Sequence, residues 1–395
     1  MMEWKEADIC QLCDSISETY KGNASEVVLI NTSDVFDGKC LNHEYVPNKK
    51  LKGQFKKTFR KGDILYSEIR PANKRFCFVD FEPKDYIAST KLMVLRAHED
   101  VDPQYLYQFL RSNDTLAQLQ MLAESRSGTF PQITYSELSN IKISLPSQKT
   151  QKNIVSILSS LDRKIELNNK INADLEEMAQ AIFKNWFVDF EPFKDGKFVD
   201  SELGMIPEGW KVGSPYEYVK VVYGAPYKSA KFNDNGEGLP LIRIRDLKDC
   251  NPQFYTPEIL PQTEYVNKGD IVAGMDAEFV PHIWKGNTGL LNQRVCKLIP
   301  QQTSISNLFV LYLMKPELEF VQSYKTGTTV SHLGKADIDK FVVVLPPLEV
   351  IEECSKLLDS ILQRIKNLSA ENSRLSLLRD TLLPRLMSGE LEVPE

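Results

Sequence analysis

The sequence predicts an α+β protein made of two similar domains, each followed by a long α-helix. The first observation is internal repetition: Leu145-Pro146 recurs as Leu345-Pro346, 200 residues later, and Lys61-Gly62-Asp63 recurs as Lys268-Gly269-Asp270, 207 residues later. A repeat this long indicates a duplicated domain, because solenoid repeats have periods of about 20–50 residues. The second observation is a mixture of strand-like and helical runs in each copy, and the third is a sustained heptad pattern after each copy.

Residues 1–150 form the first predicted domain. Short apolar, β-branched runs predict strands at Val27–Ile30, Asp63–Tyr66 and Ile141–Leu145. The stretch Pro103–Leu122 is predicted to be one helix, because a proline in the first turn is compatible with helix initiation.

Residues 209–348 are predicted to repeat this plan after a linker at 188–208 that is rich in turn-forming Pro and Gly. Strands are expected at Leu239–Ile244, Asp270–Ala273 and Phe341–Leu345.

Two long helices are predicted at 151–187 and 349–390, with apolar residues in alternating steps of four and three. This 3.5-residue period favours knobs-into-holes pairing, and about 35 residues make a rod of about 50 Å. Asparagines in such a seam cost stability and usually determine register. The alternative is that each helix packs only on its own domain. The predicted pairing positions are Leu158, Leu161, Ile165, Asn168, Asn172, Leu175, Leu358, Ile361, Ile365, Leu368, Asn372 and Leu375.

Composition indicates an ordinary soluble protein, with 42% hydrophobic and 26% charged residues. The net charge of −6 argues against a general nucleic-acid coat but allows a local basic patch. The longest clear apolar run, Leu308–Met314, is too short to span a membrane, and Met1–Lys5 lacks a signal-peptide profile. Seven scattered cysteines predict a reducing compartment, so we expect a cytoplasmic protein.

The strongest charge feature is the segment 49–61, in which seven of thirteen residues are basic and none is acidic. Lysines of this kind can neutralise DNA phosphates, although a solvated lysine-rich loop is the alternative. The candidate phosphate-binding residues are Lys49, Lys50, Lys52, Lys56 and Lys57.

In the second domain, Arg243 and Arg245 alternate around Ile244. On a strand both guanidinium groups would face one side, where arginine can read guanine. The alternative is a pair of surface arginines in ion pairs. Lys228 and Lys231 follow a turn-like aromatic cluster and are further candidates for DNA contact.

Small polar turns recur in both domains, as Arg126-Ser127-Gly128-Thr129 and Lys325-Thr326-Gly327-Thr328. Glycine allows close backbone approach, and hydroxyl groups suit phosphate or base edges. A tight turn with capping hydroxyls is the alternative. The candidate DNA-binding residues here are Arg126, Ser127, Thr129, Thr326 and Thr328.

The sequence contains no recognisable catalytic, metal or cofactor motif. Asn251-Pro252-Gln253-Phe254 lacks the second proline of the amino-methyltransferase loop, and no glycine-rich cofactor loop follows a strand upstream. Cys10 and Cys13 have no second ligand pair, and there is no phosphate-binding loop. We therefore expect a chain without catalytic activity, metal or cofactor.

The chain resembles the DNA-specificity subunit of Type I restriction-modification systems, over nearly its whole length. The resemblance is carried by Leu145-Pro146 with Gln151, by the helix end Trp186-Phe187, by Met205–Trp210 and by the ending Leu383–Glu390. The family often has Gln where this chain has Ile351, which puts one contact at the start of the second helix in doubt.

The resemblance implies two variable target-recognition domains and two helical regions that pair antiparallel. Each domain would read one half of a split, asymmetric site in double-stranded DNA, and the helices would set the spacing. It also implies partners: two methyltransferase subunits that use S-adenosylmethionine, and restriction subunits that use ATP and Mg²⁺. Two other classes stay open from the residues alone. One is a self-contained methyltransferase or nuclease, and the other is a coiled-coil adaptor that never touches DNA.

Overall fold

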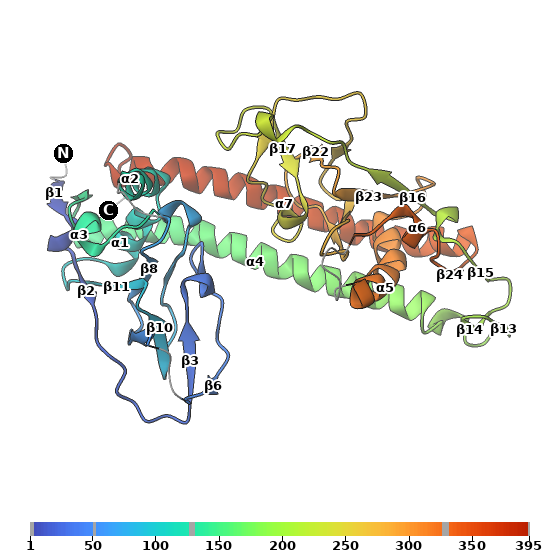
Figure 1. Ribbon diagram of the computed structural model, residues 1–395, viewed down its shortest axis with the longest axis horizontal. Coiled ribbons are helices and arrows are strands. Elements are labelled where there is room, and N and C mark those ends of the chain that lie inside the picture. The colour runs from blue at the N-terminus through green and yellow to red at the C-terminus, as the bar shows by residue number, and fades with distance from the viewer. Residues whose placement is uncertain (1–3, 50–52, 126–130, 326–331, 394–395) are drawn as a thin grey trace. The chain divides into compact units, whose positions relative to one another are not determined.

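The computed structural model describes residues 4–49, 53–125, 131–325 and 332–393 (Figure 1). The chain divides into two compact units. Unit 1 comprises Met1–Lys164 and Arg374–Glu395, and unit 2 comprises Ile165–Ser373. Two 40-residue helices, α4 (Gln148–Phe187) and α7 (Leu348–Met387), each contribute residues to both units.

Unit 1 is built on two four-stranded sheets. The first has the order β2-β11-β8-β9, with every neighbour antiparallel. The second has the order β6-β3-β10-β7 and contains one parallel pair, β3 with β10. Two pairs stand apart, β1 with β12 and β4 with β5. The strands are β1 Lys5–Asp8, β2 Cys13–Ile16, β3 Glu26–Ile30, β4 Val35–Phe36, β5 Lys39–Cys40, β6 Val46–Pro47, β7 Phe55–Lys57, β8 Ile64–Ser67, β9 Phe76–Phe78, β10 Tyr86–Ser89, β11 Leu92–Ala97 and β12 Lys142–Leu145.

Unit 2 has the same arrangement of strands. Its sheets have the orders β16-β23-β20-β21 and β18-β17-β22-β19, again with one parallel pair, β17 with β22. β15 pairs with β24 as β1 pairs with β12. The strands are β13 Phe198–Ser201, β14 Gly204–Pro207, β15 Lys211–Gly213, β16 Val219–Tyr223, β17 Leu239–Ile242, β18 Tyr255–Thr256, β19 Tyr265–Val266, β20 Ile271–Gly274, β21 Pro281–Ile283, β22 Gly289–Leu291, β23 Val295–Pro300 and β24 Val343–Leu345.

The duplicated α+β architecture is thereby confirmed. In the central strand of each first sheet, apolar residues face apolar partners: Val94 lies opposite Ile16 and Leu65, and Leu298 lies opposite Ile271. Such cross-strand pairs bury the continuous apolar runs that the sequence shows in these strands.

The helices of the two units differ in one respect. The stretch Pro103–Leu122 is helical as predicted, but the structure divides it into two helices, α1 (Pro103–Leu110) and α2 (Asn113–Glu124). Ser112 lies in extended conformation between them, and its hydroxyl accepts a hydrogen bond from the Thr115 amide. This N-cap starts a new helix and ends the first. In unit 2 the corresponding α5 (Asn307–Lys325) is continuous, and the short helices α3 (Tyr135–Ser139) and α6 (Lys335–Ile338) correspond to one another.

The turn-rich segment between α4 and the second set of strands is more ordered than a bare linker. It folds into the antiparallel hairpin β13–β14, in which Phe198 lies opposite Pro207. The aromatic residues of the family motifs, Phe187 and Trp210, are buried with ring centroids 6.0 Å apart. These motif residues therefore stabilise the core of unit 2.

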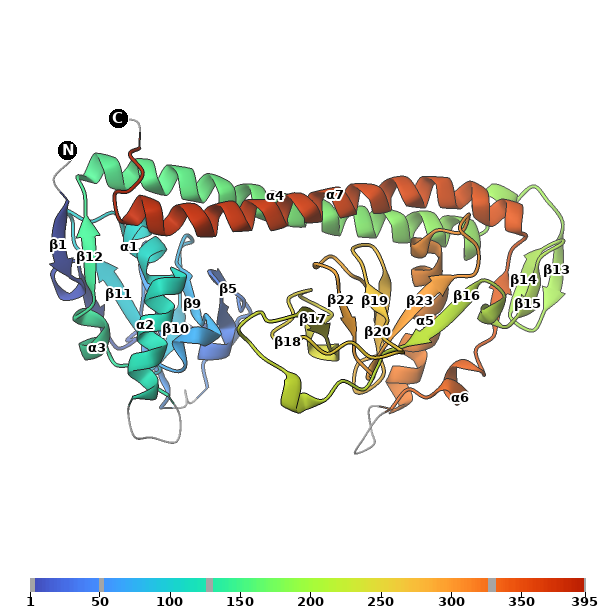
Figure 2. The same ribbon diagram turned by 90° about the horizontal axis from the view of Figure 1, so that it is seen from above.

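Within each unit, the segments of α4 and α7 lie side by side with opposite chain directions (Figures 1 and 2). Within unit 2, Asn168 contacts Asn372 and Asn172 contacts Ser369, so the partner's number falls as the first number rises. The predicted antiparallel coiled coil is confirmed. The helices also pack on the domain cores: Leu158 of α4 and Leu383 of α7 join the core of unit 1, and Leu358 of α7 joins the core of unit 2. Pairing between the helices and packing on the domains therefore coexist.

The junction between domain and helix differs between the units, as the residue Ile351 suggested. In unit 1 the buried Gln151 side chain donates to the Pro146 carbonyl at 3.0 Å and accepts from the Asp102 amide at 2.8 Å. In unit 2 Ile351 can do neither. The Tyr218 hydroxyl instead donates to the Pro346 carbonyl at 2.7 Å.

The second half of this replacement lies one helical turn beyond Ile351. The Ser355 hydroxyl accepts from the Ser306 amide at 3.0 Å, at the start of α5, as Gln151 accepts from the Asp102 amide at the start of α1. Two side chains thus replace one glutamine, and buried backbone groups stay paired in both units.

Candidate nucleic-acid interface

A polar cluster interrupts the apolar seam of unit 2. Asn168 Nδ2 donates to Glu371 Oε2 at 2.8 Å and to Asn372 Oδ1 at 2.9 Å. Asn172 Nδ2 donates to the Ser369 hydroxyl at 3.3 Å, and Asn372 Nδ2 donates to Asn169 Oδ1 at 2.8 Å. These bonds form in only one register of the two helices, so the cluster specifies that register.

The cluster is incompletely satisfied. The Oδ1 atoms of Asn168 and Asn172 are buried and accept no hydrogen bond from the residues that the structure describes. An unpaired buried carbonyl costs about 1–3 kcal/mol.

We expect Asn172→Leu to raise the free energy of unfolding by about 1 kcal/mol, because it removes an unpaired carbonyl. The Ser369 hydroxyl keeps its own bond to the Ile365 carbonyl in this variant. Urea denaturation of the full chain measures the change, with Asn185→Leu as the control, because Asn185 is an exposed asparagine of α4 outside the cluster. A loss of stability in Asn172→Leu would show that the asparagine contributes more than register.

The other predicted pairing positions differ in burial. Leu161, Ile165, Leu175 and Leu375 are partly buried. The remaining ones are buried: Leu158, Leu358, Ile361, Ile365 and Leu368.

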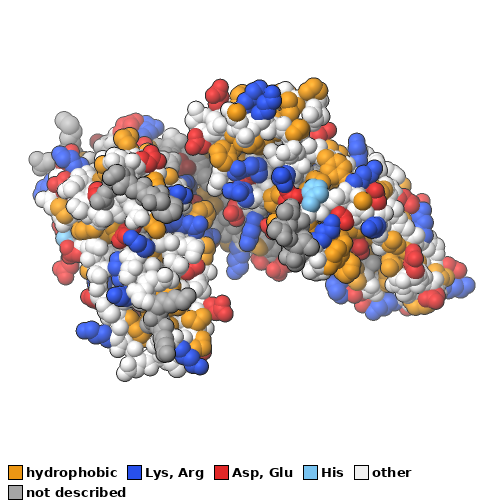
Figure 3. All heavy atoms as spheres, in the orientation of Figure 1, with side chains coloured by type: hydrophobic (Ala, Val, Ile, Leu, Met, Phe, Trp, Pro, Cys, Tyr) orange, Lys and Arg blue, Asp and Glu red, His pale blue; other side chains and the backbone are white. Residues whose placement is uncertain are grey.

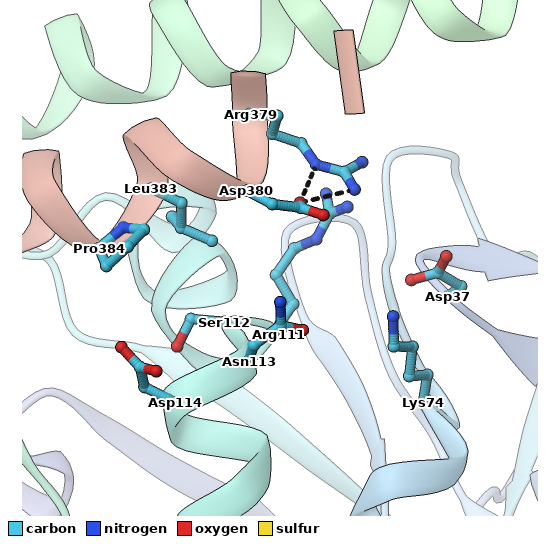
Figure 4. Close-up of a pocket in the computed structure, with 10 residues that line it drawn as sticks. All are labelled: Asp37, Lys74, Arg111, Ser112, Asn113, Asp114, Arg379, Asp380, Leu383 and Pro384. Atoms are coloured by element: carbon cyan, nitrogen blue, oxygen red, sulfur yellow. Dashed lines mark hydrogen bonds and ion pairs between the residues drawn. The ribbon is translucent and has the colours of Figure 1, made fainter. Parts of the chain in front are cut away.

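In unit 1 the seam contains a charged hub, Asp162 of α4. Its carboxylate accepts from Arg379 of α7 and from Arg111 at the end of α1, both at 2.8 Å. Arg379 also pairs with Asp380, and Figure 4 shows the Arg111 and Arg379 side chains pointing toward one another. Burial alone would lower the pKa of Arg379, but the hydrogen bonds to Asp162 and Asp380 raise it overall, so the guanidinium stays charged. One carboxylate thus joins both long helices to the end of α1 in unit 1.

A small polar pocket lies beside this hub (Figure 4). Its lining combines cations and anions from the domain and from α7, among them Lys74, Asp37 and Asp114. The mixture of charges gives the pocket no preference for an anion.

The basic segment of unit 1 divides its two adjacent lysines between opposite faces of β7. Lys56 is exposed, whereas Lys57 is partly buried and donates to the Leu92 carbonyl at 2.8 Å. Burial lowers the pKa of Lys57. Lys49 is exposed just after β6, and Lys50 and Lys52 lie outside the described residues. Among the described candidates of this segment, Lys49 and Lys56 are therefore available to a phosphate.

The strand predicted at Leu239–Ile244 is present but shorter, so the prediction that Arg243 and Arg245 lie on one side of it is wrong. β17 ends at Ile242, and a 3-10 helix follows at Ile244–Asp246. The cause is the buried carboxylate of Asp246, which accepts from both the backbone amide and the guanidinium of Arg243. Such a cap turns the chain away from the extended conformation.

The two arginines consequently differ in their surroundings. The Arg243 guanidinium is bound by Asp246 and lies 4.4 Å from the centroid of the Phe254 ring. Arg245 is exposed on the 3-10 helix. Arg245 is thus the better placed of the two for a DNA contact.

Lys228 and Lys231 surround the carboxylate of Glu258. The Lys228 amide donates to Glu258 at 2.8 Å, and the Lys231 ammonium pairs with it at 2.9 Å. Both of these interactions lower the pKa of Glu258. The Lys228 side chain is exposed. In the aromatic turn before it, a Cβ on Gly224 would lie 2.1 Å from the Asn292 carbonyl oxygen, so glycine allows a close backbone approach.

The polar turns cannot be placed in the same way. Five predicted contacts lie outside the described residues, namely Arg126, Ser127, Thr129, Thr326 and Thr328. The sequence reasoning also missed two exposed cations, Lys91 and Arg294, each directly before a central strand. The two positions are 203 residues apart and differ in residue type, so no repeated motif in the sequence marks them.

Figure 3 shows how charge is distributed on one face of the molecule. Lys and Arg side chains lie in small groups mixed with Asp and Glu, rather than in one broad basic band. This distribution favours contact through selected side chains over a general electrostatic coat.

The described residues hold no group of three or more His, Cys, Asp or Glu side chains that could bind a metal. All seven cysteines are free thiols. In the part of the chain that is described, no helix combines the length and the apolar character needed to cross a bilayer.

The chain is similar to known proteins over nearly its full length. The family described as Type I restriction modification DNA specificity domain matches residues 2–177 and 207–376. The Type I restriction enzyme HindI specificity subunit of Haemophilus influenzae is 32% identical, over 99% of this chain and 100% of that one. The Type I restriction enzyme MjaIX specificity subunit of Methanocaldococcus jannaschii is 26% identical, over 90% and 85% of the two chains.

A solved structure has the same fold. It is the S subunit of a Type I restriction-modification system from M. genitalium, with a TM-score of 0.50, 15% identity, and coverage of 98% of this chain and 96% of that one. Together with the family match and the duplicated domains, these similarities confirm the resemblance of the sequence motifs. The chain belongs to the family of Type I restriction-modification DNA specificity subunits.

Proposed function

We propose that this chain recognises DNA for a Type I restriction-modification complex and leaves the chemistry to partner subunits. The domain at 1–150 reads one half of an asymmetric site, and the domain at 209–348 reads the other. The helical regions at 151–187 and 349–390, with the segment 188–208 between them, set the spacing and dock the partners. The proposal rests on two domains of one topology that carry different side chains on a shared pair of antiparallel helices.

The partners implied are two methyltransferase subunits with S-adenosylmethionine and restriction subunits with ATP and Mg²⁺. The free thiols favour a cytoplasmic setting for this assembly. Mapping methylated adenines across the genome, with and without the gene, tests the function directly. We expect one bipartite, non-palindromic motif to lose methylation when the gene is absent.

Two outcomes would favour the rival classes. Methylation or cleavage of DNA by the purified chain alone would indicate a self-contained enzyme. If the assembled complex did not bind DNA, or bound it with an affinity independent of salt, the chain would be an adaptor, because phosphate contacts give a steep salt dependence.

We expect Lys56→Gln to weaken binding to all duplexes alike and to reduce the salt slope by about 1, as loss of one phosphate contact does. Filter binding of the assembled complex over a range of salt concentrations measures this slope. Lys57→Met should instead reduce the stability of unit 1, because its ammonium bonds to the Leu92 carbonyl. Lys142→Gln is the control, since Lys142 is exposed but paired with Glu6. Equal slopes for Lys56→Gln and wild type would remove Lys56 from the interface.

We expect Arg245→Ala to relax recognition in one half-site only, by about 1–3 kcal/mol at one base pair. Arg243→Ala should instead lower stability, because it leaves the buried Asp246 carboxylate without its cation. Selection from a randomised duplex library measures the preference at each position. Unchanged preferences in Arg245→Ala would exclude Arg245 as a base-reading residue.

A further inference from the structure

At one place in each unit, backbone hydrogen bonds join three segments that lie far apart in the sequence. We call this place the crossing. In unit 1, Glu68 lies in the turn after β8. Its backbone amide donates to the Lys91 carbonyl at 3.0 Å, and its carbonyl accepts from the Ile133 amide at 2.9 Å. In unit 2, Met275 in the turn after β20 makes the same two bonds with Arg294, at 2.9 Å, and with Leu333, at 2.7 Å.

The equivalence extends to the next residues. The isolated bridge between Ile69 and Gln132 corresponds to that between Asp276 and His332. Gln132 and His332 each come shortly after one of the polar turns, and the buried residues that follow them, Ile133 and Leu333, anchor both segments in the core. The backbone of the crossing is therefore common to both domains.

The two turns also share an unusual backbone conformation. Arg70 has φ of 46° and Ala277 has φ of 61°, although neither is glycine. A non-glycine residue in this left-handed region costs about 1–2 kcal/mol, and such residues are concentrated at functional sites. The same cost at the same place in both domains indicates a required geometry.

The side chains at the crossing differ between the domains. In unit 1 the half-exposed Lys91 contacts Gln132 at 3.4 Å and Glu68 at 3.5 Å. In unit 2 Arg294 and His332 both contact Asp276, the histidine at 2.6 Å. Arg294 is 62% exposed and His332 is 58% exposed, whereas Asp276 is only 15% exposed.

The carboxylate in unit 2 acts as an anchor. Burial would raise the pKa of Asp276, but hydrogen bonds from His332 and Arg294 lower it overall. Asp276 holds one guanidinium nitrogen, Nη1, and the other donors of Arg294 have no hydrogen-bond partner among the described residues. A guanidinium held at one end and exposed at the other is pre-oriented for a second, bidentate contact.

We infer that these crossings are base-reading positions of the two domains, with Arg294 and His332 in unit 2 and Lys91 and Gln132 in unit 1. The inference rests on the proposed DNA-reading function. Arginine and lysine bind the O6 and N7 atoms of guanine, and glutamine pairs with adenine. One scaffold with two sets of side chains explains how domains of the same fold recognise different half-sites.

The test uses the assembled complex and a randomised duplex library, with base preference read at every position. Arg294→Ala should reduce discrimination at one base pair of one half-site by about tenfold or more and leave the other half-site unchanged. Lys91→Ala should do the same in the opposite half-site. The controls are Lys211→Ala and Lys142→Ala, which remove ion-paired cations of similar exposure, 60% and 63%, from units 2 and 1.

Arg294→Lys separates base reading from phosphate binding. It keeps the charge but loses the bidentate fork, so discrimination should fall while overall affinity is largely retained. Loss of affinity on all sequences alike, or unchanged preferences in Arg294→Ala, would overturn the inference. If the wild-type complex itself showed no sequence preference, the proposed function would fail instead, so the two failures are distinguishable.

Discussion

Gln151→Leu is expected to destabilise unit 1 by about 2–4 kcal/mol, because two buried hydrogen bonds lose their side-chain partner. The leucine has a similar volume but cannot donate to the Pro146 carbonyl or accept from the Asp102 amide. Both groups lie at the junction of the first domain with α4. Hydrogen exchange of the full chain measures the effect, since lost protection should be confined to peptides of unit 1.

The control is the opposite substitution at the equivalent position of unit 2, where isoleucine is replaced by glutamine. Ile351→Gln should also destabilise, because Tyr218 and Ser355 already bind the groups that a glutamine would seek, and a buried amide without partners costs about 1–3 kcal/mol. Ile351→Leu, which nearly conserves volume, should cost less than about 1.5 kcal/mol. Two results would contradict the proposal that Tyr218 and Ser355 replace a glutamine at the second junction. One is hydrogen-exchange protection in Gln151→Leu equal to that of the wild type, and the other is unchanged stability in Ile351→Gln.

Asp162→Leu is expected to lower the stability of unit 1 by about 2 kcal/mol. The side chains of Arg111, Arg379 and Asp162 are 10%, 17% and 28% exposed, so their pairing lies between a surface ion pair and a buried one. Removal of the shared carboxylate leaves two cations with little access to water. Urea denaturation and hydrogen exchange across α7 measure the loss.

The hub should respond asymmetrically to mutation. Arg379→Leu should cost much less than Asp162→Leu, because Asp162 keeps Arg111 and a leucine suits the heptad position that Arg379 occupies. Arg374→Leu is the matched control, because Arg374 is an exposed arginine of α7 in unit 1, and its change should lie within about 0.5 kcal/mol. Equal losses in Arg379→Leu and Asp162→Leu would show that the three charges act as one indivisible network.

Much of this architecture could be predicted from local patterns. The heptad period depends only on residues three and four apart, so the long helices and their shared seam, including Asn168 and Asn372, could be read directly. Duplication was equally accessible, because repeated motifs need no knowledge of contacts. The start of the helix at residue 103 could be predicted, but its end could not, because the Ser112 cap competes locally with helix continuation.

The candidate interface was less predictable, because a sequence shows which charges are present but not which are already bound. Lys56 and Lys57 are adjacent residues of the same type, but their side chains lie on opposite faces of a strand. Arg243 and Arg245 have the same residue type and similar sequence surroundings, but the buried Asp246 forms an ion pair with Arg243.

By itself, the sequence determined the duplication, the fold class and the paired helices, since these depend on periodicity and on repeated motifs. The family followed from the resemblance of particular motifs. Only the tertiary structure decided that Lys91 meets Gln132 and that Arg294 meets His332 through Asp276. Those partners are separated by about forty residues in each domain and carry no common motif. The physical reason is that strand register and a strained turn, rather than proximity along the chain, bring these side chains together.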